Sequence, residues 1–344
     1  MRTIDWVGAV IPYPHEKITA GMTITVKPDG TFAERNIPRI NLRSSWQTNF
    51  QVWTCERTGH LGVSGNPVKF IQGHNVYAPP GNVAICAAIN QITKMLDLGE
   101  QPGNMPEDIM AAGRLTRTDI AENYVFSSPT ECQTALMDFQ TNARAKYWRE
   151  KATVGTTTYF GKRSRHTYCK MYGKGDEINV HHISRAIPEH QRALIKMEAQ
   201  NMARFEVTLA DKYCAKHDLK IGDLTEERID EIFQTMFDRI EFTPSMNIAT
   251  DEILQLSDGT KIVYFAWKLG HDLNALGMAA RTLRRHKTIL REQFGINVDV
   301  PVQEQKDENM ISIEEWNPAE QPKWADLQNK YGSSTQTGKE SGSD

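Results

Sequence analysis

The 344-residue sequence lacks several features, and each absence narrows what the chain can be. No apolar run approaches the ~18 residues that a transmembrane helix requires. The opening residues, MRTIDWVGAVIPYP, lack the basic segment and the small-residue cleavage site of a signal peptide. The five cysteines are widely spread and form no CxxC pair, which argues against a disulfide scaffold and against structural zinc. We therefore expect a protein of a reducing cytoplasm with no membrane partner.

Three catalytic signatures are missing as well. There is no GxxxxGK[ST] string, so the chain is not expected to drive strand separation with a P-loop ATPase of its own. Neither GxSxG nor HExxH occurs, which removes the common serine hydrolase and zinc protease patterns. The net charge of −3 shows no overall basic excess.

Charge is nevertheless distributed unevenly along the chain. Residues 303–344 hold nine acidic and four basic residues, whereas residues 144–174 hold nine basic residues and one acid. A second basic cluster, at residues 281–291, contains no acid. Local basic patches on a near-neutral protein suit contacts with phosphate groups. For either patch alone, a solvated helix or strand face is the simpler interpretation.

Apolar periodicity predicts a mixed α+β fold. Residues 3–11 are expected to form a buried strand, residues 22–26 a hairpin with a return through Phe32, and residues 51–55 another strand. Residues 82–98 are expected to form a helix, and a capping box at residues 128–131 opens a second helix that runs towards Trp148.

Three further strands carry a polar cluster. Residues 114–126, 166–172 and 204–209 each alternate between apolar and polar side chains, which places the polar sets on a sheet surface opposite the core. If the strands are neighbours in an antiparallel sheet, the polar residues of all three share one face, and a solvated surface would not need them. The residues expected on that face are Asp119, Tyr172, Lys174, Arg204 and Glu206.

The character of the sequence changes after Leu209. Residues 225–240 and 276–294 are predicted to form amphipathic helices, with a helix or strand at 261–269 between them. A short helix followed by a basic helix is weakly typical of a helix-turn-helix. We expect a sheet domain over residues 1–215, a helical region over 216–300 and an acidic flexible tail over 301–344.

The segment Tyr172-Gly-Lys174-Gly-Asp-Glu177 offers a nucleophile with a neighbouring cation and carboxylate. A tyrosine that attacks a phosphodiester needs a divalent cation and a basic group beside the developing charge. Asp119 and Glu206 could supply oxygen ligands for Mg²⁺ or Mn²⁺. By spacing alone this pattern is weak evidence for catalysis, because a Tyr beside a Lys usually only packs its ring against the lysine side chain. His74 alone is more often a hydrogen-bonded loop histidine than a ligand.

Several strings, in this order, resemble the replication initiators of filamentous phages, the gene II and gene X proteins, and related phage and plasmid initiators. The similarity covers roughly residues 3–300. The matching strings are GNPVKFIQGHNVY at residues 65–77, RTD at 117–119, YFGKRSRH at 159–166, MYGKGDE at 171–177 and RFEVTL at 204–209. The first of these is long enough to be specific.

This resemblance implies a site-specific, metal-dependent nickase that starts rolling-circle replication in the cytoplasm of a bacterial host. It would cut one strand of the origin, stay joined to the 5′ end through a phosphotyrosine and later rejoin the displaced strand. Tyr172 is the expected nucleophile, Lys174 would stabilise the transition state, and Glu177 would act as ligand or base. The metal would be Mg²⁺ or Mn²⁺, held by Asp119 and Glu206 with His74 as a third ligand. The wider superfamily uses a His-hydrophobe-His pair for the metal, and no such pair occurs here.

The resemblance also implies DNA as the partner of the two basic patches. A central, mostly antiparallel sheet with helices on one face would present the active site to single-stranded DNA on its other face, and the helix at 281–291 would contact duplex DNA. A host helicase and polymerase are expected partners, with a homo-oligomer possible on DNA. The residues expected to contact DNA are Lys162, Arg163, Arg165, Lys170, Arg281, Arg284, Arg285 and Lys287.

Two rival functions remain open. In the first, the chain is a DNA-binding replication regulator of the gene X type without catalysis, and Tyr172 is only structural. The intact N-terminal strand and the strand with Asp119 favour the enzyme. In the second, the chain is a relaxase or a single-strand transposase with the same chemistry. The missing His-hydrophobe-His pair and the QGHN string at residues 72–75 argue against it.

Overall fold

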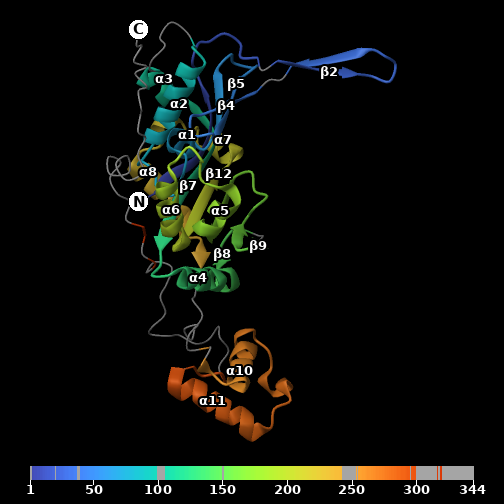
Figure 1. Ribbon diagram of the computed structural model, residues 1–344, viewed down its shortest axis with the longest axis vertical. Coiled ribbons are helices and arrows are strands. Elements are labelled where there is room, and N and C mark those ends of the chain that lie inside the picture. Colours follow the sequence, from blue (N-terminus) through green and yellow to red (C-terminus); the bar gives the residue numbers. More distant parts are fainter. Residues whose placement is uncertain are drawn as a thin grey trace, which may run out of the picture. The chain divides into compact units, whose positions relative to one another are not determined.

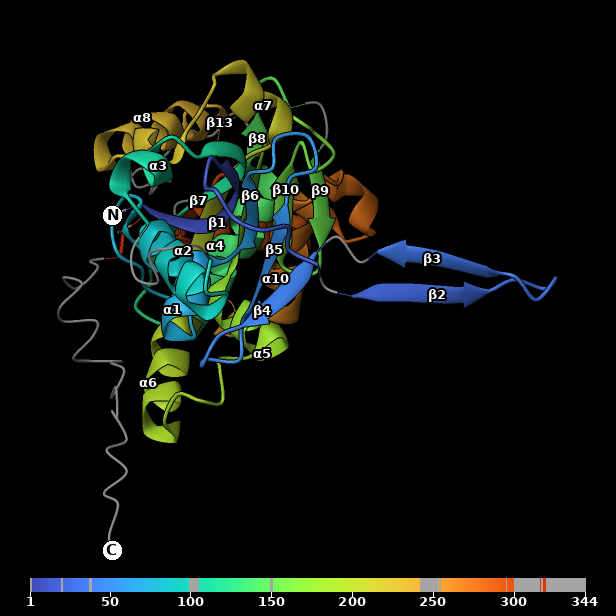
Figure 2. The same ribbon diagram turned by 90° about the horizontal axis from the view of Figure 1, so that it is seen from above.

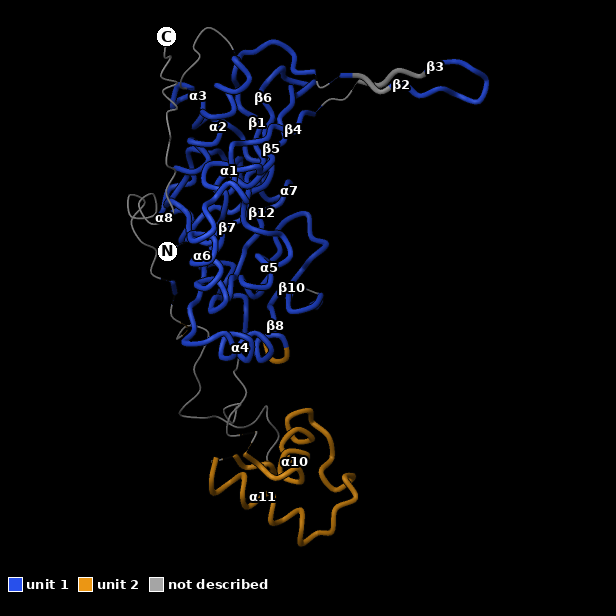
Figure 3. Tube along the Cα trace, in the orientation of Figure 1, with its two compact units in different colours: residues 1–140, 144–241, 317–344 blue, residues 141–143, 242–316 orange. Residues whose placement is uncertain are grey.

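The computed structural model describes residues 2–19, 21–36, 39–98, 105–148, 151–241, 253, 255–294, 296–299, 316 and 318–319. The chain divides into two compact units (Figure 3), of which unit 1 comprises residues 1–140, 144–241 and 317–344 and unit 2 comprises residues 141–143 and 242–316. The predicted acidic tail lies outside the described residues except for Trp316, Pro318 and Ala319. Among the described residues, no helix is both long enough and apolar enough to cross a membrane.

Unit 1 is built on a nine-stranded sheet in the order β4-β5-β6-β1-β7-β12-β11-β10-β9, and every neighbouring pair is antiparallel (Figure 1). This confirms the predicted α+β class with an antiparallel sheet. The strands are β1 (Thr3–Ile11), β4 (Ile40–Arg43), β5 (Asn49–Thr54), β6 (Leu61–Gly65), β7 (Arg114–Val125), β9 (Lys151–Val154), β10 (Thr157–Phe160), β11 (Thr167–Gly173) and β12 (Met202–Leu209).

Helices and smaller pairs of strands surround this sheet. The hairpin predicted near residue 22 forms a separate two-stranded sheet of β2 (Met22–Val26) and β3 (Phe32–Asn36), which Figure 2 shows extending as an arm. The pair β8 (Arg144–Ala145) and β13 (Ile240–Glu241) forms another. The helices of unit 1 are α1 (Pro67–Gln72), α2 (Val83–Met95), α3 (Glu107–Ala111), α4 (Pro129–Asn142), α5 (Lys174–His181), α6 (Glu189–Gln200), α7 (Asp211–Lys216) and α8 (Glu226–Phe237).

The apolar face of the sheet carries the core of unit 1. Phe205 of β12 meets Phe233 and Phe237 of α8 edge-on, with ring centroids 5.6 and 5.2 Å apart. Helix α4 contributes Phe139, whose ring meets Phe160 of β10 at 6.0 Å. Such aromatic pairs add stabilisation to the burial of their area. The structure therefore assigns α8, which the sequence analysis grouped with residues 216–300, to unit 1.

The central strands align their polar residues in rows across the opposite face. Asp119 of β7 is opposite Thr208 of β12, which is opposite Tyr168 of β11. The next row pairs Glu206 with Lys170. Because side chains alternate along a strand, these residues share one face, as the sequence predicted for Asp119 and Glu206.

That polar face is covered at one end. Helices α5 and α6 and the segment at residues 76–77 enclose an apolar cluster with Met202, the first residue of β12. The cluster comprises Val76, Tyr77, Ile178, Ile183, Ile187, Ile195, Ala199 and Met202. This apolar packing holds in place the end of the sheet where strand β11 continues into helix α5.

Unit 2 is a small helical body with its own core. It contains α10 (Asp258–Lys268), the 3₁₀ turn η2 (Leu273–Leu276) and α11 (Ala280–Phe294). The alternatives left open for residues 261–269 thus resolve to a helix. Its core includes Val263, Tyr264 and Leu290. The side chain of Ser257 caps α10 by accepting a hydrogen bond from the amide of Thr260.

Candidate functional site

The polar face of the central strands carries two adjoining groups of charged side chains. We call one the carboxylate cluster; it consists of Arg117, Asp119, Tyr168, Lys170 and Glu206. We call the other the buried network; it consists of Asp5, Lys69, Asn75, Lys174, Glu177 and Arg204. Tyr172 lies between them on β11.

In the carboxylate cluster, each acid is already paired with a cation. Arg117 donates two hydrogen bonds to Asp119, from Nε to Oδ1 at 2.9 Å and from Nη2 to Oδ2 at 2.6 Å. Its Nη2 also donates to the Tyr168 hydroxyl at 3.2 Å. The Lys170 ammonium lies 2.6 Å from Oε2 of Glu206. Burial raises the pKa of Asp119, and the neighbouring Arg117 opposes that rise. The cluster is therefore a compact set of balanced charges.

Tyr172 joins this cluster through its hydroxyl, which donates a hydrogen bond to Glu206. Its side chain is buried, with 7% of its surface exposed, and the Lys170 ammonium lies 5.0 Å from the centre of its ring. Burial and the charge of Glu206 both raise the pKa of Tyr172, so its phenol is neutral at ordinary pH. A carboxylate in direct contact with a neutral phenol is placed to accept its proton.

Lys174 and Glu177 form a pair in the first turn of α5. The fully buried ammonium of Lys174 donates to Oδ1 of Asn75 at 2.8 Å and to Oε2 of Glu177 at 2.7 Å, while Lys69 binds Oε1 of Glu177 at 2.8 Å. Burial and the positive charge of Arg204 lower the pKa of Lys174 to about 7. The sequence predicted Lys174 beside the phenolate; in the structure its ammonium binds Asn75 and Glu177.

Arg204 is the centre of the buried network. Its guanidinium donates to Asp5 Oδ1 at 2.9 Å, to Asn123 Oδ1 at 2.7 Å and to the carbonyls of residues 75 and 76. Asn75 also donates to Asp5 Oδ1, at 2.5 Å. Burial raises the pKa of Asp5, but Arg204 and Lys174 outweigh it, and the pKa is lowered overall. Strand β1, the loop after α1 and the two central strands are thereby joined at one residue.

The three expected metal ligands are not assembled in one group. Asp119 and Glu206 lie on neighbouring strands, whereas His74 belongs to the loop after α1, near the buried network. Burial, with Lys174, Lys69 and Arg204 nearby, lowers the pKa of His74 to about 3, so its imidazole is neutral. Among the residues that the structure describes, no group of three or more His, Cys, Asp or Glu side chains is arranged to hold a metal ion.

The oxygen donors of the carboxylate cluster nevertheless suit a hard cation. Thr208, opposite Asp119, has a buried hydroxyl with no hydrogen-bond partner within the described part of the chain. Two carboxylates and a hydroxyl are the kinds of ligand that Mg²⁺ and Mn²⁺ take. A cation bound there would take over the balancing charges that Arg117 and Lys170 now provide.

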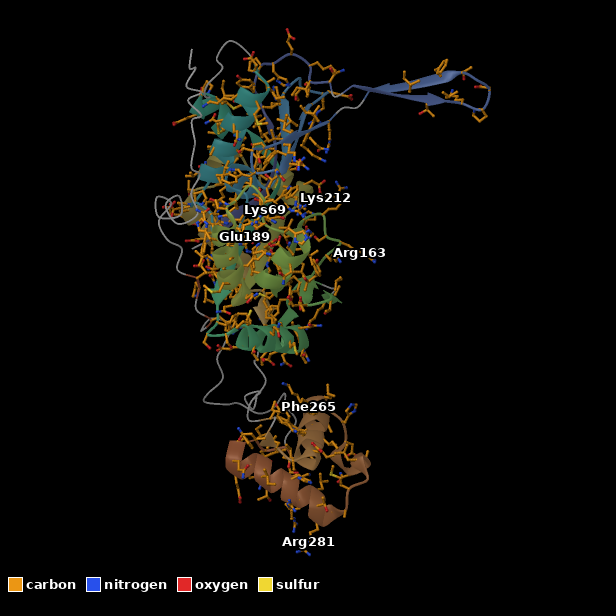
Figure 4. The ribbon with its side chains drawn as sticks, viewed as in Figure 1. Lys69, Arg163, Glu189, Lys212, Phe265 and Arg281 are labelled. Atoms are coloured by element: carbon orange, nitrogen blue, oxygen red, sulfur yellow. The ribbon has the colours of Figure 1, made fainter. Side chains whose placement is uncertain are left out.

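The side chains that the sequence predicts to contact DNA differ in whether they already bind another side chain of the protein. Arg163 lies on the loop after β10, where it is exposed (Figure 4). The Lys162 ammonium lies 4.3 Å from the Tyr159 ring centre, and Arg165 pairs with Asp211. Lys170 is directed at Glu206.

In unit 2, the basic residues occupy one side of α11. Arg281, Arg284 and Arg285 are exposed, and Leu283 and Leu290 are buried on the other side. Figure 4 marks Arg281. Lys287 binds Asp299 at 2.7 Å. The three exposed arginines can therefore meet a phosphate backbone.

Sequence reasoning missed the residues that hold the buried network together. The missed residues are Asp5, Lys69, Asn75 and Asn123. One signal was present, because Asp5 is the single acid in the largely apolar strand at residues 3–11. A buried acid of this kind requires a cationic partner.

Comparison with known proteins gives three similarities. A family of phage replication-associated proteins, defined by the N-terminal part of the gene II protein, matches residues 3–228. The replication-associated protein of this type from Enterobacteria phage I2-2 is 29% identical over 321 residues, which cover 90% of this chain and 92% of that protein. A rolling circle replication initiator protein from Geobacillus stearothermophilus, of known structure, is 12% identical with a TM-score of 0.31, covering 72% of this chain and 88% of that one.

The buried ammonium of Lys174 predicts a pH-dependent stability. Its pKa falls from 10.5 to about 7 on folding, so between these values the unfolded chain binds more protons and the free energy of unfolding rises with pH. Lys174→Met removes this contribution, which is at most about 1.4 kcal/mol per pH unit. Urea unfolding at about pH 7.5 and pH 9.5 measures it. Lys212→Met, at an exposed position, is the control and keeps the wild-type slope. Equal slopes for wild type and Lys174→Met would contradict the lowered pKa.

Proposed function

The chain belongs to the family of phage replication-associated gene II proteins, and from this membership we propose that it initiates rolling-circle replication as a site-specific DNA nickase and strand transferase. Origin DNA, as duplex and as displaced single strand, is the substrate. In this proposal a host helicase separates the strands and a host polymerase extends the 3′ end.

The observation that carries this proposal is the hydrogen bond from Tyr172 to Glu206, with Lys170 beside both. In the proposed step, the Tyr172 oxygen attacks phosphorus, its proton passes to Glu206, and the 3′ oxygen leaves and takes a proton to become the primer hydroxyl. The new bond is a 5′-phosphotyrosine. Lys170 offsets the negative charge that builds up on the phenol and the phosphate. The free 3′ end of the displaced strand later attacks this bond and releases the tyrosine.

We assign the divalent cation, Mg²⁺ or Mn²⁺, to Asp119 and Glu206. The support is their hard oxygen chemistry and the Thr208 hydroxyl on the same face, which has no hydrogen-bond partner among the residues that the structure describes. When bound, the cation would neutralise charge on the scissile phosphate. His74 as third ligand rests only on the resemblance to the phage initiators, since the structure places it near the buried network and not with Asp119 and Glu206.

Lys174 and Glu177 have a positioning role in this proposal. They connect the first turn of α5 to Asn75 and Lys69, immediately after the strand that carries Tyr172. Their contacts hold the end of β11 against the loop after α1, and so keep the phenol within reach of Glu206.

Replacing the nucleophile should abolish nicking. Tyr172→Phe removes the attacking oxygen and should lower nicking of supercoiled origin DNA by at least about a thousandfold while DNA binding stays near wild type. Tyr168→Phe, on the same strand face, is the matched control and should retain most activity. Gel assays for open circles in Mn²⁺ measure both. Nicking by Tyr172→Phe combined with inactive Tyr168→Phe would move the nucleophile to Tyr168, and DNA binding without nicking by wild type would favour a non-catalytic regulator.

The metal assignment has its own test. Asp119→Asn and Glu206→Gln each remove one charged ligand and should raise the Mn²⁺ concentration for half-maximal cleavage by about tenfold or more. Glu227→Gln, on an exposed turn of α8, leaves the titration unchanged. Unaltered Mn²⁺ titrations for both site variants would remove these carboxylates from the metal site.

We assign duplex contact to α11 of unit 2. Reversing charge at Arg284 and Arg285 removes two exposed cations from one helix side and should weaken duplex binding. The slope of log K against log salt should flatten by about 0.9 for each phosphate group that the helix no longer binds. Fluorescence anisotropy over a salt series measures it, with Lys216→Glu on α7 as control. An unchanged slope for the double variant places duplex recognition elsewhere.

A further inference from the structure

A pocket of about 330 Å³ opens beside α6, away from the carboxylate cluster. Ile183 and Ala193 supply apolar lining, and Arg185, Arg192 and Lys196 supply three positive charges. Glu189 is the one acid among the lining residues. A hollow of this size with apolar and basic lining residues is suited to a small anionic ligand with an apolar part.

The positively charged side chains of the pocket lie on α6 and on the loop that precedes it. Arg192 and Lys196 are four residues apart and so share a side of α6. Arg192 also donates to the carbonyl of Arg185 at 3.4 Å, which ties the loop before α6 to the helix. A solvated helix face requires neither this link nor a cavity. The three positively charged side chains therefore line one cavity.

The pocket is rigidly connected to the proposed active site. Helix α5 starts directly after Tyr172 and Gly173 and ends at His181, and His182 lines the pocket. Eight residues of helix span about 12 Å. Ile183 also packs in the same apolar cluster as Val76, next to the loop that Arg204 holds. The distance between Tyr172 and the pocket is thus fixed by packed elements of unit 1.

The length of α5 corresponds to a short piece of a DNA strand. A strand with base-stacked spacing advances about 3.4 Å per nucleotide, so about 12 Å corresponds to about three to four nucleotides. We infer that the pocket binds one nucleotide of the single strand held at the active site, a few nucleotides from the scissile phosphate. The location rests on the proposed function, because that function puts the scissile phosphate at Tyr172.

Each part of the pocket has a role in this inference. Arg185, Arg192 and Lys196 bind the phosphates on either side of the nucleotide. The base covers Ile183 and Ala193. Glu189 accepts a hydrogen bond from a donor on the base edge, and its negative charge disfavours a bare phosphate ion. The pocket therefore distinguishes a nucleotide within a strand from a free anion.

The test uses the full-length protein and labelled single strands that contain the origin nick site, lengthened one nucleotide at a time on either side. With wild type, the affinity measured by anisotropy rises by at least roughly tenfold at the length that reaches the pocket. Arg192→Glu with Lys196→Glu removes that step, and Arg192→Gln with Lys196→Gln, a milder pair, reduces it. Lys212→Glu with Lys216→Glu, on exposed positions of α7, reverses the same charge and retains the step (Figure 4 marks Glu189 and Lys212).

The outcomes separate this inference from the proposed function. Loss of the step in the Glu pair with its reduction in the Gln pair supports the pocket even if wild type forms no tyrosine adduct, in which case only the nicking proposal fails. A tyrosine adduct together with an unchanged step in both variants overturns the pocket. An abasic residue at the reaching position should cancel the gain, and an undiminished gain would overturn the binding of a base. Competition by inorganic phosphate as strong as by a strand would reduce the pocket to a simple anion site and contradict the inference.

Discussion

The structure of this protein depends on one buried cation, the guanidinium of Arg204. As for any buried ion, moving such a charge out of water costs roughly several kcal/mol unless an opposite charge pairs with it and its N–H groups donate hydrogen bonds. Here Asp5 pairs with it, and Asn123 and the carbonyls of residues 75 and 76 take its other donors. Asp5 and Asn75, which precede Arg204 by 199 and 129 positions in the sequence, are thereby held at one point. Neither Asp5 nor Arg204 could be removed alone without leaving an unpaired charge in the interior.

This constraint extends to the site through Asn75. The side chain of Asn75 binds both Asp5 and Lys174, and Lys174 binds Glu177, so the first turn of α5 is fixed to the loop that Arg204 clamps. Tyr172 lies just before that turn, with its hydroxyl on Glu206. The same rigid α5 leads to the basic pocket beside α6. Buried hydrogen bonds and apolar packing thus connect the proposed nucleophile, the proposed acceptor of its proton and the basic pocket, which is how a site is held in a productive geometry.

Much of the sheet could be predicted from the sequence, because alternation along residues 114–126, 166–172 and 204–209 reports which side chains share a face. That pattern placed Asp119, Glu206 and Tyr172 together, and the structure agrees. Asn75, which binds Lys174, and the partners of Arg204 could not be predicted, since they lie on segments up to 199 residues away and no local pattern encodes them. Periodicity likewise predicted a helix over residues 225–240, observed at Glu226–Phe237, but could not tell that its apolar side packs on Phe205.

The central claim is that Tyr172 attacks DNA, and mapping the covalent adduct tests it most directly. Wild-type protein would be reacted with origin DNA and Mn²⁺, stopped in detergent, digested with nuclease and trypsin, and analysed by mass spectrometry. Cleavage after Arg165, Lys170 and Lys174 places Tyr168 and Tyr172 on separate peptides. We expect the nucleotide on the peptide of residues 171–174. A nucleotide on the peptide of residues 166–170, or on a peptide from another part of the chain, would contradict the account.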